Sequence, residues 1–223
     1  MVGSQRWRQA LVWLHVITSV GWMAQALVLF TLLSAGFGSA EREVRVAATS
    51  MAHVVDTALL APLANAGAFT GFVLAAATPW GFFRNWWVLA KFAITGVQLY
   101  AGIFVLSGAL RATAADAEAG AAPPLPLLAG TALMASAIAF QAWLSVAKPW
   151  RRTPWASTRK LPAASKRVFA VAVFAPIADI ALGLVTGFPS PLFEVLVLVV
   201  VLSARPRRGR GSAPRPDSVS ASA

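Results

Sequence analysis

Cysteine is absent from this chain of 223 residues, histidine occurs only twice, and charged residues make up only 12% of it. The absence of cysteine excludes disulfides, thiolate metal sites and cysteine nucleophiles. Soluble domains carry about 25% charged residues, whereas 58% of this chain is hydrophobic. No glycine-rich phosphate loop, nucleophile triad or paired-carboxylate pattern is visible, and the methionines are too scattered to indicate copper. The composition therefore predicts an all-α integral membrane protein without a metal site.

Six apolar segments follow one another along the chain, and the first five reach the roughly 20 residues that cross a hydrocarbon core about 30 Å thick. They cover residues 10–35, 51–77, 86–110, 125–147, 168–188 and 191–204. The last segment is short for a span. This pattern predicts a polytopic transmembrane helical bundle of six spans, with a four-helix core and a short C-terminal hairpin. We expect residues 1–204 to form a single domain and residues 205–223 to form a basic, disordered cytoplasmic tail.

The net charge of +11 would indicate nucleic acid in a soluble protein, but here its placement indicates topology. If the N-terminus is cytoplasmic, all basic residues except Arg42, Arg45 and Arg111 fall on the cytoplasmic side. The positive-inside rule therefore favours an even number of spans with both termini cytoplasmic. We expect a multi-pass protein of the cytoplasmic (plasma) membrane, surrounded by lipid and without a nucleic-acid partner. The first segment is longer than a signal-peptide core of about 7–15 residues, so we expect it to remain as an anchor.

Two side chains that can carry charge, His15 and Lys91, lie inside apolar segments. A full charge near the centre of a membrane helix costs roughly 2.5 to 3.5 kcal/mol, so such residues are candidates for function. Helical spacing places each of them on a polar face, with Trp22 on the first span and Gln98 on the third. At about 1.5 Å per residue, both lie roughly 7–8 Å from the cytoplasmic boundary. We therefore predict one inner-leaflet cavity lined by His15, Trp22, Lys91 and Gln98.

Simpler interpretations of both residues stay open. In one, Lys91 snorkels, with its stem in lipid and its amine at the interface. In the other, His15 is hydrogen-bonded to a neighbouring helix and has no further role. The second histidine, His53, lies roughly 20 Å from His15 along the membrane normal, so we do not expect the two to ligate one haem. His53 and Asp56 are spaced i, i+3, which favours an ion pair at the outer surface over a metal or proton site.

Asp179 lies near the middle of the fifth segment, three residues after Pro176. A carboxylate at that depth must be protonated, paired or open to water. Asp179 is therefore a candidate for proton or ion transport, with Asn65 along the same path. Glu194 opens the sixth segment, and we expect it to be solvated near the outer interface.

Two pairs of glycines have the small-xxx-small spacing, Gly67 with Gly71 and Gly183 with Gly187. This spacing allows two helices to approach closely. Packing within the bundle is favoured over a homo-oligomer formed through either pair. The basic segment 148–167 is a candidate site for anionic lipid.

Three motifs occur in order over roughly residues 10–110. They are Leu14-His15 followed by Gly21-Trp22-Met23-Ala24, the Pro62 helix ending near Gly71, and Trp86-Trp87-Val-Leu-Ala-Lys91. Together they resemble a superfamily of small bacterial polytopic membrane proteins that includes the copper-resistance D-type proteins and the HemJ-type membrane protoporphyrinogen oxidases. In those oxidases a His in the first span and a Lys at the start of a later one are tied to haem and catalysis, and by resemblance His15 and Lys91 match these positions.

The resemblance therefore implies haem as a cofactor. The Arg and the additional His expected just after the first span of the oxidases are absent here, where the sequence continues Leu27-Val-Leu-Phe-Thr-Leu. This departure indicates a separate branch of the superfamily.

Three functions follow from these observations, and no residue is assigned a catalytic role. The leading hypothesis is a redox or haem-associated protein that holds a porphyrin or quinone-like ligand, with His15 as ligand or proton acceptor and Lys91 paired with a propionate or another anionic group. The second is a transporter of a small solute or ion that uses Asp179, with Asn65 and Gln98 along the path. The third is a structural or accessory membrane subunit whose segment 148–167 binds anionic lipid.

Overall fold

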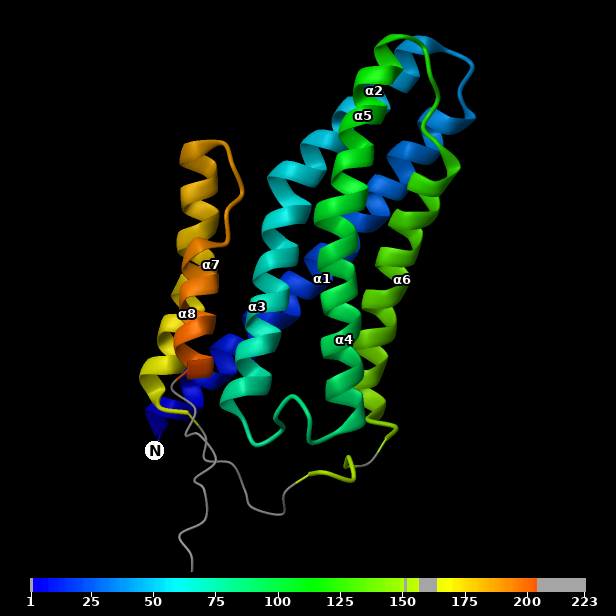
Figure 1. Ribbon diagram of the computed structural model, residues 1–223. Helices are drawn as coiled ribbons and strands as arrows, with labels where there is room; N and C mark the ends of the chain where they lie inside the picture. The colour runs from blue at the N-terminus through cyan, green and yellow to red at the C-terminus, as the bar shows by residue number, and fades with distance from the viewer. Residues whose placement is uncertain (1, 151, 157–163, 204–223) are drawn as a thin grey trace, which may run out of the picture.

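The computed structural model describes residues 2–150, 152–156 and 164–203. In these ranges every regular element is a helix, apart from one isolated bridge between Asn85 and Arg152 (Figure 1). The all-α prediction is therefore confirmed for the described part of the chain. The predicted tail, 205–223, and part of the basic segment 148–167 lie outside the described residues.

The helices follow one another in an up-and-down order. They are α1 (Val2–Gly38), α2 (Arg42–Val55), α3 (Ala61–Ala77), α4 (Trp86–Tyr100), α5 (Ser107–Glu118), α6 (Leu125–Ala147), α7 (Lys166–Thr186) and α8 (Leu192–Ser203). A turn of π-helix, Asp56–Leu60, joins α2 to α3 without a break, and a second one, Ala101–Leu106, joins α4 to α5. Pro62 follows the first of these turns and has no N–H to donate, which removes a helical hydrogen bond at this point.

Five helical rods are long and apolar enough to cross a membrane. They are Gln5–Gly38, Arg42–Ala77, Trp86–Glu118, Leu125–Ala147 and Lys166–Thr186. By contrast, α8 has 12 residues, or about 18 Å at 1.5 Å per residue, which is less than a hydrocarbon core of about 30 Å. The described chain is therefore built as an integral membrane protein with five full-length spanning helices, and the predicted sixth span is a short apolar helix.

The helices α1, α3, α4 and α6 form the central bundle, and the α7–α8 hairpin lies against α1 and α3 (Figure 1). Leu11, Phe69 and Phe169 belong to a buried cluster that joins α1, α3 and α7. A second cluster around Trp22 and Met134 joins α1, α3 and α6. The four-helix core and the C-terminal hairpin thus appear as the sequence predicts.

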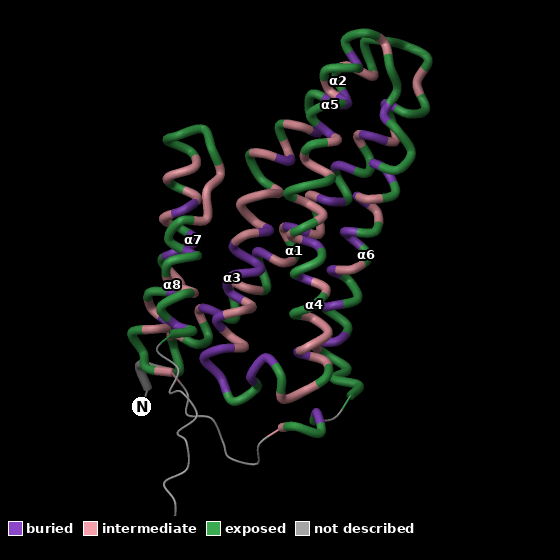
Figure 2. Tube along the Cα trace, viewed as in Figure 1, coloured by how far each residue is buried: buried purple, intermediate pink, exposed green. Residues whose placement is uncertain are grey.

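Exposed residues recur along the helices of the bundle (Figure 2), and many of them are large aliphatic or aromatic residues. Val97, Val146 and Val185 are 68%, 85% and 85% exposed. Soluble monomers rarely show continuous apolar patches larger than a few hundred Å². A surface of this kind is covered by lipid, which requires that the backbone polar groups be satisfied inside the helices.

The two ends of the bundle differ in charge. One end holds the start of α1, the loop between α3 and α4 and the segment after α6 (Figure 1), and the charged residues described there are all basic. They are Arg6, Arg8, Arg84, Lys148, Arg152, Lys166 and Arg167. At the opposite end both signs occur, and the Arg42 guanidinium donates to the Glu118 carbonyl. We call these the basic end and the mixed-charge end.

Candidate functional site

His15 and Lys91 line one cavity of about 610 Å³ near the basic end. We call it the inner cavity. Ligand sites usually measure about 300–1,000 Å³. The walls come from α1, α3, α4, α6 and the loop after α3, and they combine apolar rings with a few polar groups. The rings are Trp13, Phe72, Trp80, Phe82, Trp87 and Phe92, and the polar groups include Arg8, Gln9, His15, Lys91, Thr95, Gln141 and Ser145.

The imidazole of His15 is held by α3. Its Nδ1 lies 3.0 Å from the Gly67 carbonyl oxygen and 3.1 Å from Thr70 Oγ1. A carbonyl oxygen only accepts, so Nδ1 carries the proton in the neutral ring and donates it. The Nε2 atom then keeps its lone pair and has no hydrogen-bond partner among the described residues. This arrangement fixes the tautomer that serves as a metal ligand or proton acceptor.

Gly71 provides the space for the imidazole. A Cβ atom at Gly71 would lie 3.0 Å from His15 Cε1, and one at Gly67 would lie 3.6 Å from Thr18 Oγ1. The small residues of α3 therefore bring it close to α1 within one chain. In α7, Gly183 faces its own following loop and Gly187 ends the helix with φ +72°. A homo-oligomer through either pair stays a prediction.

The ammonium group of Lys91 lies inside the bundle. Its Nζ donates to Ser145 Oγ on α6 at 2.6 Å, so the head group contacts a neighbouring helix. An ammonium has three donors, and two remain after this bond. None of the described residues that line the inner cavity is Asp or Glu. Lys91 is thus a cation with no carboxylate partner in the described part of the chain, next to a cavity that Arg8 also lines.

A hydrogen-bonded ladder between α4 and α6 forms the wall behind Lys91. Gln141 accepts from Thr95 at 2.9 Å and donates to Gln98 Oε1, while Gln98 donates to the Met134 carbonyl at 3.0 Å. Gln98 is buried and supports the wall through Gln141, but it does not itself border the inner cavity. Sequence reasoning missed Gln141 and Ser145, although two polar residues four apart in the apolar segment 125–147 are a signal.

A second cavity of about 310 Å³ shares His15 and Lys91 and extends along α1 and α6 to Trp22. The Trp22 Nε1 atom is buried and has no hydrogen-bond partner among the residues that the structure describes. Buried indole N–H groups usually have one. Of the four residues predicted to line one cavity, the structure brings His15, Lys91 and Trp22 to connected spaces, with Gln98 behind the wall.

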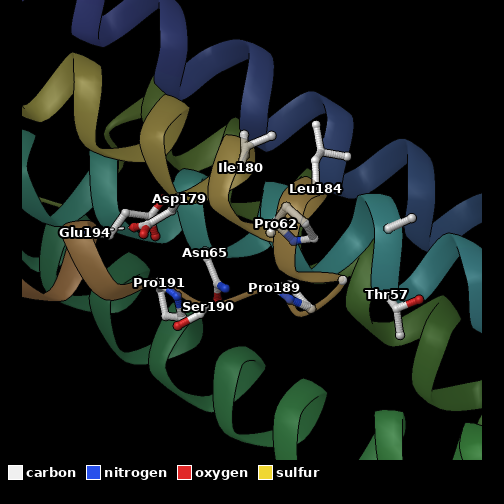
Figure 3. A pocket seen from close by; sticks show the side chains of 13 residues that line it. Thr57, Pro62, Asn65, Asp179, Ile180, Leu184, Pro189, Ser190, Pro191 and Glu194 are labelled. Carbon is white, nitrogen blue, oxygen red and sulfur yellow. Dashed lines mark hydrogen bonds between the residues drawn. The ribbon is translucent and has the colours of Figure 1, made fainter.

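Asp179 has a structural partner that the sequence did not reveal. Its Oδ1 accepts from the Phe193 N–H at 3.0 Å and its Oδ2 from the Glu194 N–H at 2.8 Å. The carboxylate thus caps the N-terminus of α8. Asp179 also borders a pocket of about 220 Å³ together with Asn65 (Figure 3), so the two residues of the transport hypothesis do lie together. We call it the hairpin pocket.

Two expectations about acidic residues are wrong. Glu194 is only 3% exposed and lines the hairpin pocket, whereas we expected it to be solvated. Asp56 is 5% exposed and interacts with the Ser107 side chain, so it does not form a surface ion pair with His53. The His53 Nδ1 atom has no hydrogen-bond partner. Among the described residues, no group of three or more His, Cys, Asp or Glu side chains could hold a metal ion.

The basic segment is fixed to the loop before α4 where it is described. Thr153 and Trp155 both donate to the Phe83 carbonyl, at 2.6 and 3.0 Å. The Lys148 ammonium lies 5.3 Å from the centre of the Trp80 ring. Binding of anionic lipid to segment 148–167 stays a prediction.

No protein-family model matches the chain, and the comparisons with curated proteins and with solved structures gave no match. The resemblance to the copper-resistance D-type and HemJ-type superfamily is therefore still a prediction, and function has to be argued from the geometry.

Proposed function

We propose that the inner cavity binds a planar amphipathic ligand with an acidic group, with haem as the first candidate, in a redox or haem-associated membrane protein. One observation carries the proposal: the free Nε2 of His15 and the uncompensated ammonium of Lys91 face the same aromatic-lined cavity. The rings supply apolar contact for a flat molecule. The cations supply charge-assisted hydrogen bonds to a carboxylate.

The residues that line the inner cavity include one histidine for the iron of a porphyrin and two cations for its two propionates. His15 Nε2 would hold the iron, since its Nδ1 is already held by the Gly67 carbonyl. Lys91 and Arg8 would face the propionates. A bound haem iron would supply one-electron chemistry. His53 lies in α2, fourteen residues before Gly67 on one continuous rod, or about 21 Å away. It is therefore no second ligand to the same iron.

An absorption spectrum tests this proposal. Protein purified in mild detergent from haem-replete cells should show a Soret band, and His15→Ala should lose it. His53→Ala is the matched control and should keep it, because His53 lies in the other half of the bundle. A colourless wild-type protein from such cells would rule out haem. Binding of a quinone that His15→Ala weakens would then assign the cavity to the quinone class.

The transport hypothesis keeps one supporting observation, the pocket that Asp179 and Asn65 share. Both oxygens of Asp179 are occupied by backbone N–H groups of α8, which gives this residue a positioning role. A residue of the hairpin pocket that couples transport to a proton or ion would therefore be a residue other than Asp179.

A further inference from the structure

The hairpin pocket lies between α3, the π-helical turn before it and the α7–α8 hairpin (Figure 3). It shares no lining residue with the inner cavity. Its polar residues come from five segments of the chain, and none of its described lining residues is Lys, Arg or His. They are Thr57, Asn65, Asp179, Ser190 and Glu194.

The start of α8 lies well short of the end of α7 along the bundle. Because Asp179 contacts the N–H groups of Phe193 and Glu194, α8 begins at the level of Asp179. Seven more residues of α7 follow, to Thr186, so α8 starts about 10 Å short of the end of α7. The non-helical stretch 187–191 therefore runs back along α7. Irregular backbone at membrane depth is tolerated where it lines a cavity.

The backbone around the pocket has few hydrogen-bond donors. Pro62, Pro189 and Pro191 border it and have no N–H. Thr57 and Ala58, about one turn before Pro62, also line the pocket.

Glu194 is the unpartnered group. It is 3% exposed, it borders the pocket, and its carboxyl group has no hydrogen bond or ion pair to a basic group among the described residues. Asp179, by contrast, is held by two backbone donors. Figure 3 shows the two carboxyl groups close together, with the Asn65 side chain approaching from α3. Two buried carboxylates without a counter-charge are unstable as anions, so a cation or a proton must accompany them.

We propose that the hairpin pocket binds a small monovalent cation, Na⁺ in the first place, with the Glu194 carboxylate as the charged ligand and Asp179 as the residue that positions it. The side-chain oxygen of Asn65, which lines the same pocket, is the second ligand, since hard cations take oxygen ligands. When the cation enters, the proton on Glu194 leaves, so the charge of the pocket is conserved. This site is independent of the ligand proposed for the inner cavity.

Thermal unfolding in detergent tests the proposal. The wild-type protein is compared in NaCl and in N-methylglucamine chloride at equal ionic strength. Na⁺ should raise the midpoint in a saturable way, because a ligand of the folded state stabilises it. Glu194→Gln keeps the shape of the side chain and should abolish the response. Glu118→Gln, an exposed acid at the mixed-charge end, is the control and should retain it. Equal Na⁺ responses in the wild type and Glu194→Gln, or no response in the wild type, would overturn the proposal.

A second measurement uses the wild type alone, in case Glu194→Gln does not fold. A hydrophobic carbodiimide reacts with protonated buried carboxyl groups, and mass spectrometry locates the adduct. At about ten times its dissociation constant, Na⁺ should slow labelling of Glu194 about tenfold, because only that fraction of sites stays free. Labelling at a rate independent of Na⁺ contradicts the proposal.

Discussion

Asp179 in the hairpin pocket and Lys91 in the inner cavity are two buried charges that are treated in opposite ways. Each lies where lipid surrounds the bundle, which costs several kcal/mol unless the charge is satisfied. In the hairpin pocket, the Asp179 carboxylate is satisfied by the backbone of α8. In the inner cavity, Lys91 has one neutral partner, Ser145, and no lining carboxylate. The difference separates a charge that the fold uses from a charge that is left for a ligand.

Removing the carboxylate of Asp179 should have the largest effect on stability. Asp179→Ala leaves two buried N–H groups at the start of α8 without acceptors, and each such group costs about 1–3 kcal/mol. We expect a loss of about 2–4 kcal/mol in the free energy of unfolding, measured by denaturant titration in detergent. Asp179→Asn keeps one acceptor and should lose about half as much.

Asp116→Ala, an exposed acid on α5, is the matched control and should change little. Ligand binding in the inner cavity should survive in Asp179→Ala. If Asp179→Ala were as stable as Asp116→Ala, the carboxylate would not be a cap, and the contrast between the two sites would disappear.

Gly71→Ala should damage the inner cavity alone. The new Cβ would lie 3.0 Å from His15 Cε1, so the imidazole or the helix must shift, and overpacking of this kind costs about 1–3 kcal/mol. Gly96→Ala is the control, because a Cβ there meets nothing within 4 Å. We expect Gly71→Ala to be less stable than Gly96→Ala by that amount and to bind the cavity ligand about tenfold more weakly, as read from unfolding and spectral titration. Equal behaviour of the two variants would show that Gly71 does not set the position of His15.

Lys91→Met should separate stability from binding. An unpaired cation contributes little to folding, and its replacement by an apolar side chain of similar length is expected to be neutral or stabilising. Binding of an acidic ligand should fall about tenfold, or about 1.4 kcal/mol, since a charge-assisted contact is lost. Lys148→Met, at the ring of Trp80, is the control for removing a cation at the basic end. A clear loss of stability in Lys91→Met with unchanged binding would make Lys91 a structural residue.

The sequence predicts the residues that line the inner cavity better than it predicts the contacts in the hairpin pocket. Helical spacing and charge placement put His15 and Lys91 at matched depth on helices that run the same way, and the structure places both in one cavity. The energetic cost of a carboxylate in lipid singles out Asp179 in the sequence. The sequence does not show which group contacts that carboxylate. The partner is the backbone of α8, and its position depends on how the stretch 187–191 folds back along α7.

The positions of Glu194 and Gln98 also differ from the prediction, because contacts between helices cannot be predicted from the pattern within one helix. The position of Glu194 at the start of an apolar segment predicts an interface, because the sequence does not show that α8 begins at the level of Asp179. Gln98 was placed on the correct helix face, but whether it borders a cavity depends on its partner in α6, Gln141. Register between helices is a property of the packed bundle, and periodicity within one helix does not determine it.

The amide pair of Gln98 and Gln141 should give the smallest effect and the finest test of the comparison. Hydrogen bonds between membrane helices average about 0.6 kcal/mol, so Gln98→Leu and Gln141→Leu should each cost about 1 kcal/mol once the unpaired partner is included. The double variant should cost less than the sum, because it leaves neither amide of the pair without the other. A double-mutant cycle in detergent measures this coupling. If the two single effects simply add, the amides of Gln98 and Gln141 are not coupled. The hydrogen bond between them then does not stabilise the wall behind Lys91.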